Sequence, residues 1–218
     1  MIDGITVTVD ADAVVVRASA PLAVVSSAPV GGGVSPACTI VNLHVAKDFM
    51  HRELGALIHD FAQPRGLPAP WVGFLTAART ERAEIAVERV DDVVALAVVT
   101  VGLSRPISVV RAAPATATPV GTINSVVVLD ADLDDAALVN VLATVSEVKA
   151  VLLGAASVRC DDGAPATGTA TDAIAVAATA RGPRHAFGGP STVPGAAAAR
   201  AAHRALDRGI ARWLEAHR

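Results

Sequence analysis

Two apolar runs rich in β-branched residues constrain the fold of this chain most strongly. They are Val93–Val101 (VVALAVVTV) and residues 122–129 (TINSVVVL). Valine and isoleucine favour extended backbone, and such runs are typical of strands in the interior of a sheet. Together with the helical segments below, they predict the α/β class: one mixed β-sheet with helices packed on it, in a single compact domain spanning 1–218.

The rest of the chain supplies further strands and a few helices. Residues 14–17 and 22–25 are predicted to form a hairpin or meander that follows a strand at Ile5–Val9, and further strands are predicted at 39–45 and 172–179. Helices are predicted over 48–62, 132–155 and 196–216. Proline and glycine cluster at 29–36, 64–70 and 182–195, which predicts loops there.

Composition narrows the class of protein. Of the 218 residues, 52% are hydrophobic and 18% charged, which is typical of a compact globular chain. The formal net charge of −3 gives no basic footprint for nucleic acid. No apolar run of about 18 residues is uninterrupted, so no membrane span is expected.

The termini and cysteines bear on location. The first residues, MIDGITVTVDADAVVV, include acids and no basic segment, which argues against a secretory signal. Cys38 and Cys160 form no CxxC pattern, and they are predicted to be free thiols in a reducing cytoplasm. Oligomeric state is left open, with a homo-oligomer as one alternative.

A lysine interrupts the apolar stripe of the predicted helix 132–155. At 100° per residue the stripe consists of Leu138, Val141, Leu142, Val145 and Leu152. Lys149 falls within it, whereas Glu147 lies nearly opposite, in line with Asn140 and Thr144. A buried ammonium is costly unless a carboxylate or another partner meets it. The alternative is that Lys149 reaches solvent past the stripe.

The segment 166–172, ATGTATD, leads directly into the apolar run AIAVAATA. Its composition alone favours a turn, because glycine permits unusual backbone angles and threonine and aspartate bond local N–H groups. The alternative is a polar pocket wall at a strand end, formed by Thr167, Thr169, Thr171 and Asp172.

Other polar residues are weaker candidates. Period-two alternation places Asn42 and His44 on one face of the strand 39–45. The glycines at 31–33, after Ser26 and Ser27, could approach an anion, but no nucleotide-binding fingerprint is present. His44, His51 and His59 lack metal-ligand spacing, so no metal site is predicted.

The order of these short motifs resembles the adenosylcobinamide amidohydrolase family. The chain reads SSAPVGGG, IVNLHV, GFLTAA, VTVGL, GTINSVVVL, SEVKAVLL and TGTATD. Members of the family are similar to SSAxxGGG, an Asn after an apolar strand, TAA, TxGL, GTIN, a TEAK-like helix and TGTxTD in that order. The departures are SEVK at 146–149 and a looser glycine-rich segment at 188–195.

The resemblance implies an enzyme of cobalamin salvage without a bound cofactor. It would hydrolyse the amide between the corrin side arm and aminopropanol in adenosylcobinamide, giving adenosylcobyric acid. Its partner would be a corrinoid small molecule. The matched motifs predict these substrate-binding residues: Ser26, Ser27, Gly32, Gly33, Asn42, His44, Thr122, Asn124, Thr167, Thr169 and Thr171.

The catalytic assignment rests on the charged residues of the matched motifs. Asp172 is predicted to be the general base or nucleophile, Glu147 is the second choice, and Lys149 gives electrostatic support. Two other functions stay open: a corrinoid-binding protein without catalysis, and a kinase-like enzyme acting on cobinamide. The absence of a P-loop motif argues against the kinase.

Overall fold

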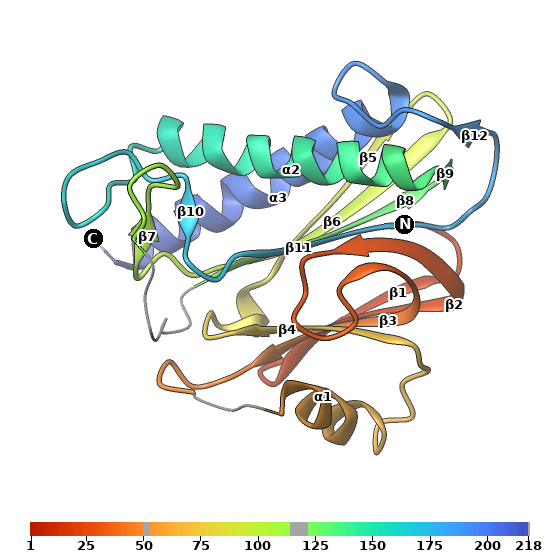
Figure 1. The fold of residues 1–218 in the computed structure, drawn as a ribbon, viewed down its shortest axis with the longest axis horizontal. Coiled ribbons are helices and arrows are strands. Elements are labelled where there is room, and N and C mark those ends of the chain that lie inside the picture. Colours follow the sequence, from red (N-terminus) through yellow and green to blue (C-terminus); the bar gives the residue numbers. More distant parts are fainter. Residues whose placement is uncertain (50–52, 114–121, 218) are drawn as a thin grey trace.

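The protein folds around one mixed sheet of eight strands (Figure 1). The computed structural model describes residues 1–49, 53–113 and 122–217. The strand order is β4-β3-β2-β11-β8-β6-β5, and β1 also pairs with β2. The pairs β3–β4 and β11–β8 are parallel, and the other pairs are antiparallel. The strands of this sheet are β1 (Ile5–Val9), β2 (Ala13–Ser26), β3 (Gly33–His44), β4 (Trp71–Thr76), β5 (Glu84–Val90), β6 (Val93–Val101), β8 (Ile123–Asp130) and β11 (Ala173–Ala178).

Helices and short strand pairs complete the chain. The helices are α1 (Leu54–Ala62), α2 (Asp135–Ala155), α3 (Val193–Ala216) and the 3-10 helix η1 (Thr80–Arg82). The short pairs are β7 (Pro106–Ile107) with β10 (Gly168–Thr169), and β9 (Asp132–Leu133) with β12 (Arg184–His185). The predicted α/β class with a mixed sheet in a single compact domain is confirmed.

The sheet bends into two layers through the long strand β2. The first half of β2 pairs with β1 and its last residues pair with β11, and the β2–β3 register shifts between Arg17 and Leu22. As a result, β1, β3 and β4 face β11, β8 and β6 across a shared core (Figure 1). Val16, Ile40 and Phe74 from the first layer pack there with Leu96 and Val128 from the second.

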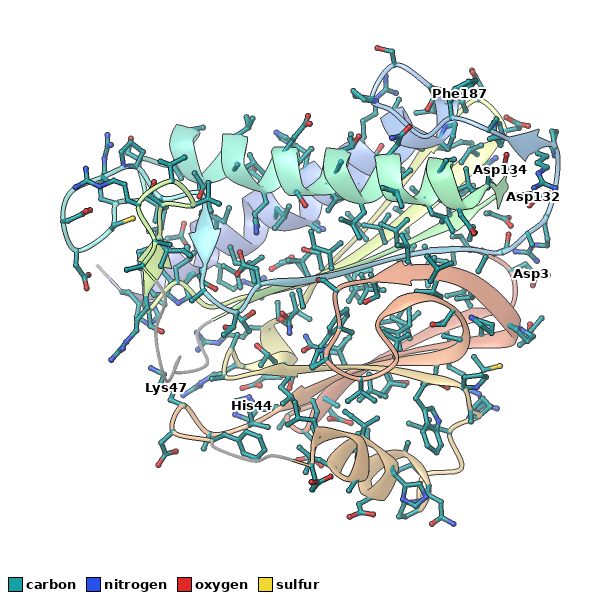
Figure 2. The ribbon with its side chains drawn as sticks, viewed as in Figure 1. Asp3, His44, Lys47, Asp132, Asp134 and Phe187 are labelled. Atoms are coloured by element: carbon teal, nitrogen blue, oxygen red, sulfur yellow. The ribbon has the colours of Figure 1, made fainter. Side chains whose placement is uncertain are left out.

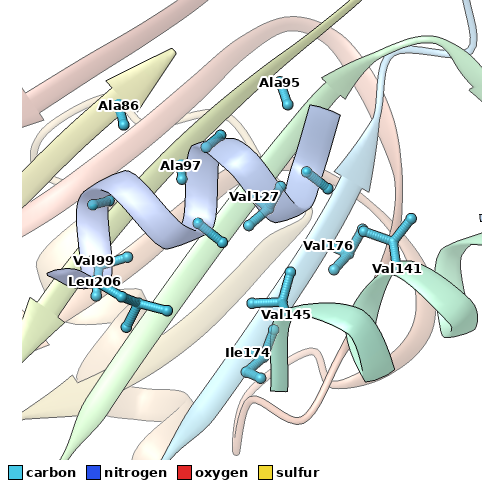
Figure 3. Close-up of a cluster of buried hydrophobic side chains, with 14 of the residues drawn as sticks. Ala86, Ala95, Ala97, Val99, Val127, Val141, Val145, Ile174, Val176 and Leu206 are labelled. Atoms are coloured by element: carbon cyan, nitrogen blue, oxygen red, sulfur yellow. The ribbon is translucent and has the colours of Figure 1, made fainter. Parts of the chain in front are cut away.

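Helices cover the two outer faces. Figure 3 shows α3 and α2 over β5, β6, β8 and β11, with Val127 and Val176 from the sheet beside Val141, Val145 and Leu206 from the helices. Buried alanines of α3 let this helix lie close to the sheet. On the other outer face, Ile58 of α1 is fully buried against β2 and β3. The layers therefore run helix, sheet, sheet, helix.

Most predicted elements are present. The strands at Ile5–Val9 and Val93–Val101 match residue for residue, and those predicted at 122–129 and 172–179 are β8 and β11 within one residue at each end. The loop predicted at 64–70 is irregular, as expected.

Several boundaries were wrong. Residues 14–17 and 22–25 belong to the single strand β2, which the register shift bends without ending it. Strand β3 begins at Gly33, inside the predicted loop 29–36. Pro36 is tolerated in this strand because the stretch of β3 that contains it pairs with β2 alone. The strands β4 and β5 were missed.

The helix boundaries also shifted. Lys47 and Asp48 form a turn, so the first helix starts at Leu54 and not at 48, with residues 50–52 outside the described chain. Residues 132–133 form β9, so α2 starts at Asp135. Helix α3 starts at Val193, inside the predicted loop 182–195, because Thr192 accepts a hydrogen bond from the Gly195 N–H and caps the helix.

Helix α2 is long and apolar enough to cross a membrane by length and composition. Its buried face includes Leu138, Val141 and Leu153, and it packs against α3 and β11. In this structure α2 therefore contributes to the core of the domain, as its apolar stripe predicts.

Gly195 provides a test of the packing at the start of α3. A Cβ atom there would lie 1.9 Å from the Gly189 carbonyl oxygen and 2.5 Å from that of Gly188. Backbone must move to relieve such contacts, so we expect Gly195→Ala to lower the free energy of unfolding by about 2 kcal/mol in chemical denaturation. Gly154→Ala on α2 is the control, because open space surrounds Gly154 and alanine favours helix. Equal stability of the two variants would contradict this packing.

Candidate functional site

Lys149 on α2 and Asp172 before β11 form a nearly buried ion pair. The Lys149 Nζ lies 2.5 Å from the Asp172 Oδ2, and only 13% and 9% of the two side chains are exposed. Lys149, which interrupts the apolar stripe, therefore has in Asp172 the partner that a buried ammonium requires. Its side chain does not reach past the stripe to solvent.

Asp172 accepts three hydrogen bonds besides that of Lys149. Its Oδ1 accepts from the Ile123 N–H at 2.9 Å and from the Thr169 hydroxyl at 2.5 Å, and its Oδ2 also accepts from the Thr169 N–H at 3.0 Å. A Cβ atom on Gly168 would lie 2.5 Å from the Asp172 Oδ2, so glycine lets the backbone close over the pair. Asp172 thus joins α2, β8 and β10.

A buried chain of polar side chains runs from Asp172 into the space between the layers. The Thr122 hydroxyl lies 2.8 Å from both the Thr171 carbonyl and the Asn124 Oδ1. The Asn124 Nδ2 donates to the Asn42 Oδ1 at 2.8 Å, and the Asn42 Nδ2 donates to the Thr100 hydroxyl at 2.9 Å. Asn42 and Asn124 are 4% and 1% exposed. Residues far apart in sequence therefore meet at one end of the sandwich.

Ser26, Ser27 and the glycines at 31–33 lie at the same end of the sandwich, beside the start of β11. The Ser27 hydroxyl accepts from the Ile174 N–H, and the Ser26 hydroxyl donates to the Ile174 carbonyl, each at 3.0 Å. Gly33 pairs with Ser26, and a Cβ atom on Gly32 would lie 2.2 Å from the Ala28 carbonyl oxygen. These glycines build a tight turn beside the start of β11.

His44 lies at the end of β3, two residues beyond Asn42 on the same face of the strand. Its Nδ1 is 3.0 Å from the Ala78 carbonyl, which can only accept, so this nitrogen carries a proton. In the neutral ring the Nε2 is then an acceptor. Figure 2 shows His44 and Lys47 at the end of the molecule opposite Asp132 and Asp134.

Two predicted site residues lie apart from this cluster. Glu147 is exposed on α2, and its position is 200° around the helix from that of Lys149. The expectation that Glu147 faces the same cleft as Asp172 is therefore wrong. The Thr167 hydroxyl accepts from the Val109 N–H at 2.9 Å and fixes the β7–β10 loops.

In the described part of the chain, no three His, Cys, Asp or Glu side chains gather closely enough to hold a metal ion. His51 lies outside the described residues. Cys38 and Cys160 are free thiols, as predicted.

Sequence reasoning missed three contributors to the site. Thr100 reaches Asn42 from β6, Gly168 admits the ion pair, and the Ile123 N–H holds Asp172. A polar residue within the apolar run VVALAVVTV was the available signal for Thr100. Backbone donors such as the Ile123 N–H leave no signal in side-chain identity.

The cluster combines groups that hydrolysis of an amide requires: a carboxylate, a cation and several hydroxyls at one end of the sheet. Comparison with known proteins agrees with this chemistry. The sequence model described as adenosylcobinamide amidohydrolase matches residues 1–218. The chain belongs to this family. No curated protein matches the chain. In this member of the family, the matched GTIN and TGTATD motifs meet at the Asp172 carboxylate.

Asn124 makes three hydrogen bonds in the buried interior. Its amide group bonds Asn42, Thr122 and the Leu75 carbonyl, so its removal leaves buried polar groups without partners. We expect Asn124→Ala to lower the free energy of unfolding by about 3 kcal/mol. Asn140→Ala, at an exposed position of α2, is the control. Urea denaturation of both variants measures the effect, and a loss below about 0.5 kcal/mol for Asn124→Ala would refute the chain as a structural element.

Proposed function

We propose that this protein hydrolyses the amide joining aminopropanol to the corrin side arm of adenosylcobinamide, giving adenosylcobyric acid. The observation that carries the proposal is membership of the adenosylcobinamide amidohydrolase family along the whole chain. The meeting of its motifs around Lys149 and Asp172 supports catalysis over passive binding. We also propose a cytoplasmic location, which the two free thiols support.

Asp172 is the group that we assign to proton transfer. The hydroxyl nearest its carboxylate is that of Thr169, at 2.5 Å. Removal of this proton, or of one from a water molecule that takes its place, produces an oxygen nucleophile. That oxygen forms a bond to the amide carbon as the carbonyl becomes an oxyanion.

Lys149 supplies the positive charge in this scheme. An ammonium group has three N–H donors, of which Asp172 takes one. The cation therefore stabilises the oxyanion while holding Asp172 in place, and in a nearly dry site its charge is little screened. The carbon–nitrogen bond then breaks, and the departing amine takes the proton that Asp172 removed. Where water is the nucleophile, its oxygen becomes the hydroxyl of the new acid. Where Thr169 is the nucleophile, a water molecule then hydrolyses the ester that it formed and restores the Thr169 hydroxyl.

Among the remaining predicted residues, the exposed ones are assigned to substrate contact and the buried ones to support of the wall. Corrinoids carry a fringe of carboxamides, which hydroxyl and imidazole groups can bond. Ser27 and His44 are exposed at the relevant end of the sheet, and we propose that they contact this fringe. Ser26, Asn42, Thr122 and Asn124 lie behind them and fix the wall.

The test is incubation with adenosylcobinamide and detection of free aminopropanol by mass spectrometry. Release that depends on the protein supports hydrolysis. A corrinoid that gains phosphate in the presence of ATP would support the kinase-like alternative. A corrinoid that stays bound and unchanged would support a carrier, and either of these results would overturn the proposed activity.

A further inference from the structure

A cavity of about 330 Å³ lies beside the polar cluster, between α3 and the segment that follows β4. This volume falls in the range of small-ligand sites. Its lining includes Lys47, Arg79, Arg82, Gly102, Arg212 and Trp213. The proposed function assigns nothing to this cavity.

The charged side chains of the lining all have the same sign. All of its ionised side chains are cations, contributed by Lys47, Arg79, Arg82 and Arg212, although the whole chain has a formal net charge of −3. Arg212 is paired with Glu84 at 2.7 Å. Among the residues that the structure describes, no carboxylate forms an ion pair with Lys47, Arg79 or Arg82. Within the described chain, three cations therefore lie around a concave space without an ion-pair partner.

The walls between these cations are held in place. Trp213 packs against the core on one side, and its ring stacks on that of His217 with 4.0 Å between centroids. On the other side, the Gly102 N–H donates to the Thr122 carbonyl at 3.0 Å. The cavity thus shares a wall with the polar chain that leads to Asp172.

We propose that this cavity binds a phosphoryl group. Arginine presents planar pairs of N–H donors that match phosphate oxygens, and a concave surface lined by one sign of charge concentrates an anion of the opposite sign. The group belongs either to a free phosphate compound or to a phosphate carried by the side arm of a larger ligand. Its chemistry is the same in both cases.

Calorimetric titration with inorganic pyrophosphate tests the site without any corrinoid, so the result does not depend on the proposed hydrolysis. We expect saturable binding that weakens by about tenfold or more in Arg79→Ala and in Arg82→Ala. Arg200→Ala, at an exposed position of α3 outside the cavity, should bind as the unaltered protein does. Acetate serves as the control for a weak, singly charged anion.

Absence of saturable pyrophosphate binding, or equal binding by all three variants, would overturn the proposal. Melting curves of the variants exclude unfolding as the reason for any loss. A second titration, with phosphorylated adenosylcobinamide and then with unphosphorylated adenosylcobinamide, distinguishes the sources. Loss of affinity for the phosphorylated compound alone in Arg82→Ala identifies the side-arm phosphate. Unchanged affinity for both, with pyrophosphate binding lost, identifies a free phosphate compound.

Discussion

Asp172→Asn is expected to reduce turnover of adenosylcobinamide by about a hundredfold or more. The substitution keeps the shape of the side chain, but an amide cannot take a proton. The Ile123 N–H and the Thr169 hydroxyl can still donate to the remaining oxygen. Steady-state kinetics at saturating substrate measures the loss, because the proposed role of Asp172 lies in the chemical step.

Folding must be separated from catalysis in that variant. Asp172 also joins α2 to β8. The melting temperature of the Asp172→Asn variant is therefore measured alongside its turnover. Asp207→Asn, at an exposed position of α3, is the matched control and should keep both properties. If Asp172→Asn melts earlier but turns over substrate within a few-fold of the unaltered protein, Asp172 is a structural anchor and not a base.

Lys149→Met is expected to lower the free energy of unfolding by about 3 kcal/mol. The methionine fills a similar volume, but the Asp172 carboxylate stays in a site where 9% of its side chain is exposed and loses its counter-ion. Chemical denaturation measures the effect. Three other donors still bond Asp172, which keeps the expected loss at the lower end for a buried ion pair.

A double-mutant cycle isolates the ion pair. Combining Lys149→Met with Asp172→Asn removes both charges. The double variant should therefore lose about 2 kcal/mol less stability than the sum of the losses in the two single variants. Lys47→Met changes the other lysine of the sequence, which is exposed, and should alter stability by less than about 0.5 kcal/mol. Strict additivity in the cycle would show that the pair contributes no coupling.

The sequence was informative where one physical requirement dominated. The run Val93–Val101 is an interior strand between β8 and β5, and its residue type and length left few other solutions. Lys149 could be recognised as a residue in need of a partner, because a cation interrupted an apolar stripe. The identity of that partner depends on how α2 packs on β10 and β11, which local sequence does not encode.

Elements that depend on distant pairing were harder to predict. Strand β2 was predicted as two strands, and the break between them falls where its register with β3 shifts, between Arg17 and Leu22. The bend there follows from the pairing of β1 and then of β11 along the same edge of β2. The contact of Asn42 with Asn124 requires that bend. Alternation placed Asn42 on a face of its strand, but the layer that this face meets is a property of the whole fold.

Exposed polar residues were the least predictable. Glu147 shares a polar stripe with Asn140 and Thr144, yet only Thr144 is buried. A helical stripe tells which residues point the same way and not what they meet. Membership of a short matched motif was therefore a weaker guide to the position of Glu147 than the burial of its neighbour Lys149.

Hydrolysis in heavy-oxygen water tests the central claim most directly. Adenosylcobinamide is incubated with the protein in water enriched in the heavy isotope, and the corrinoid product is analysed by mass spectrometry. Our account predicts adenosylcobyric acid with one heavy oxygen in the newly formed carboxyl group, together with unlabelled aminopropanol. A corrinoid that retains aminopropanol after prolonged incubation with folded protein would contradict it.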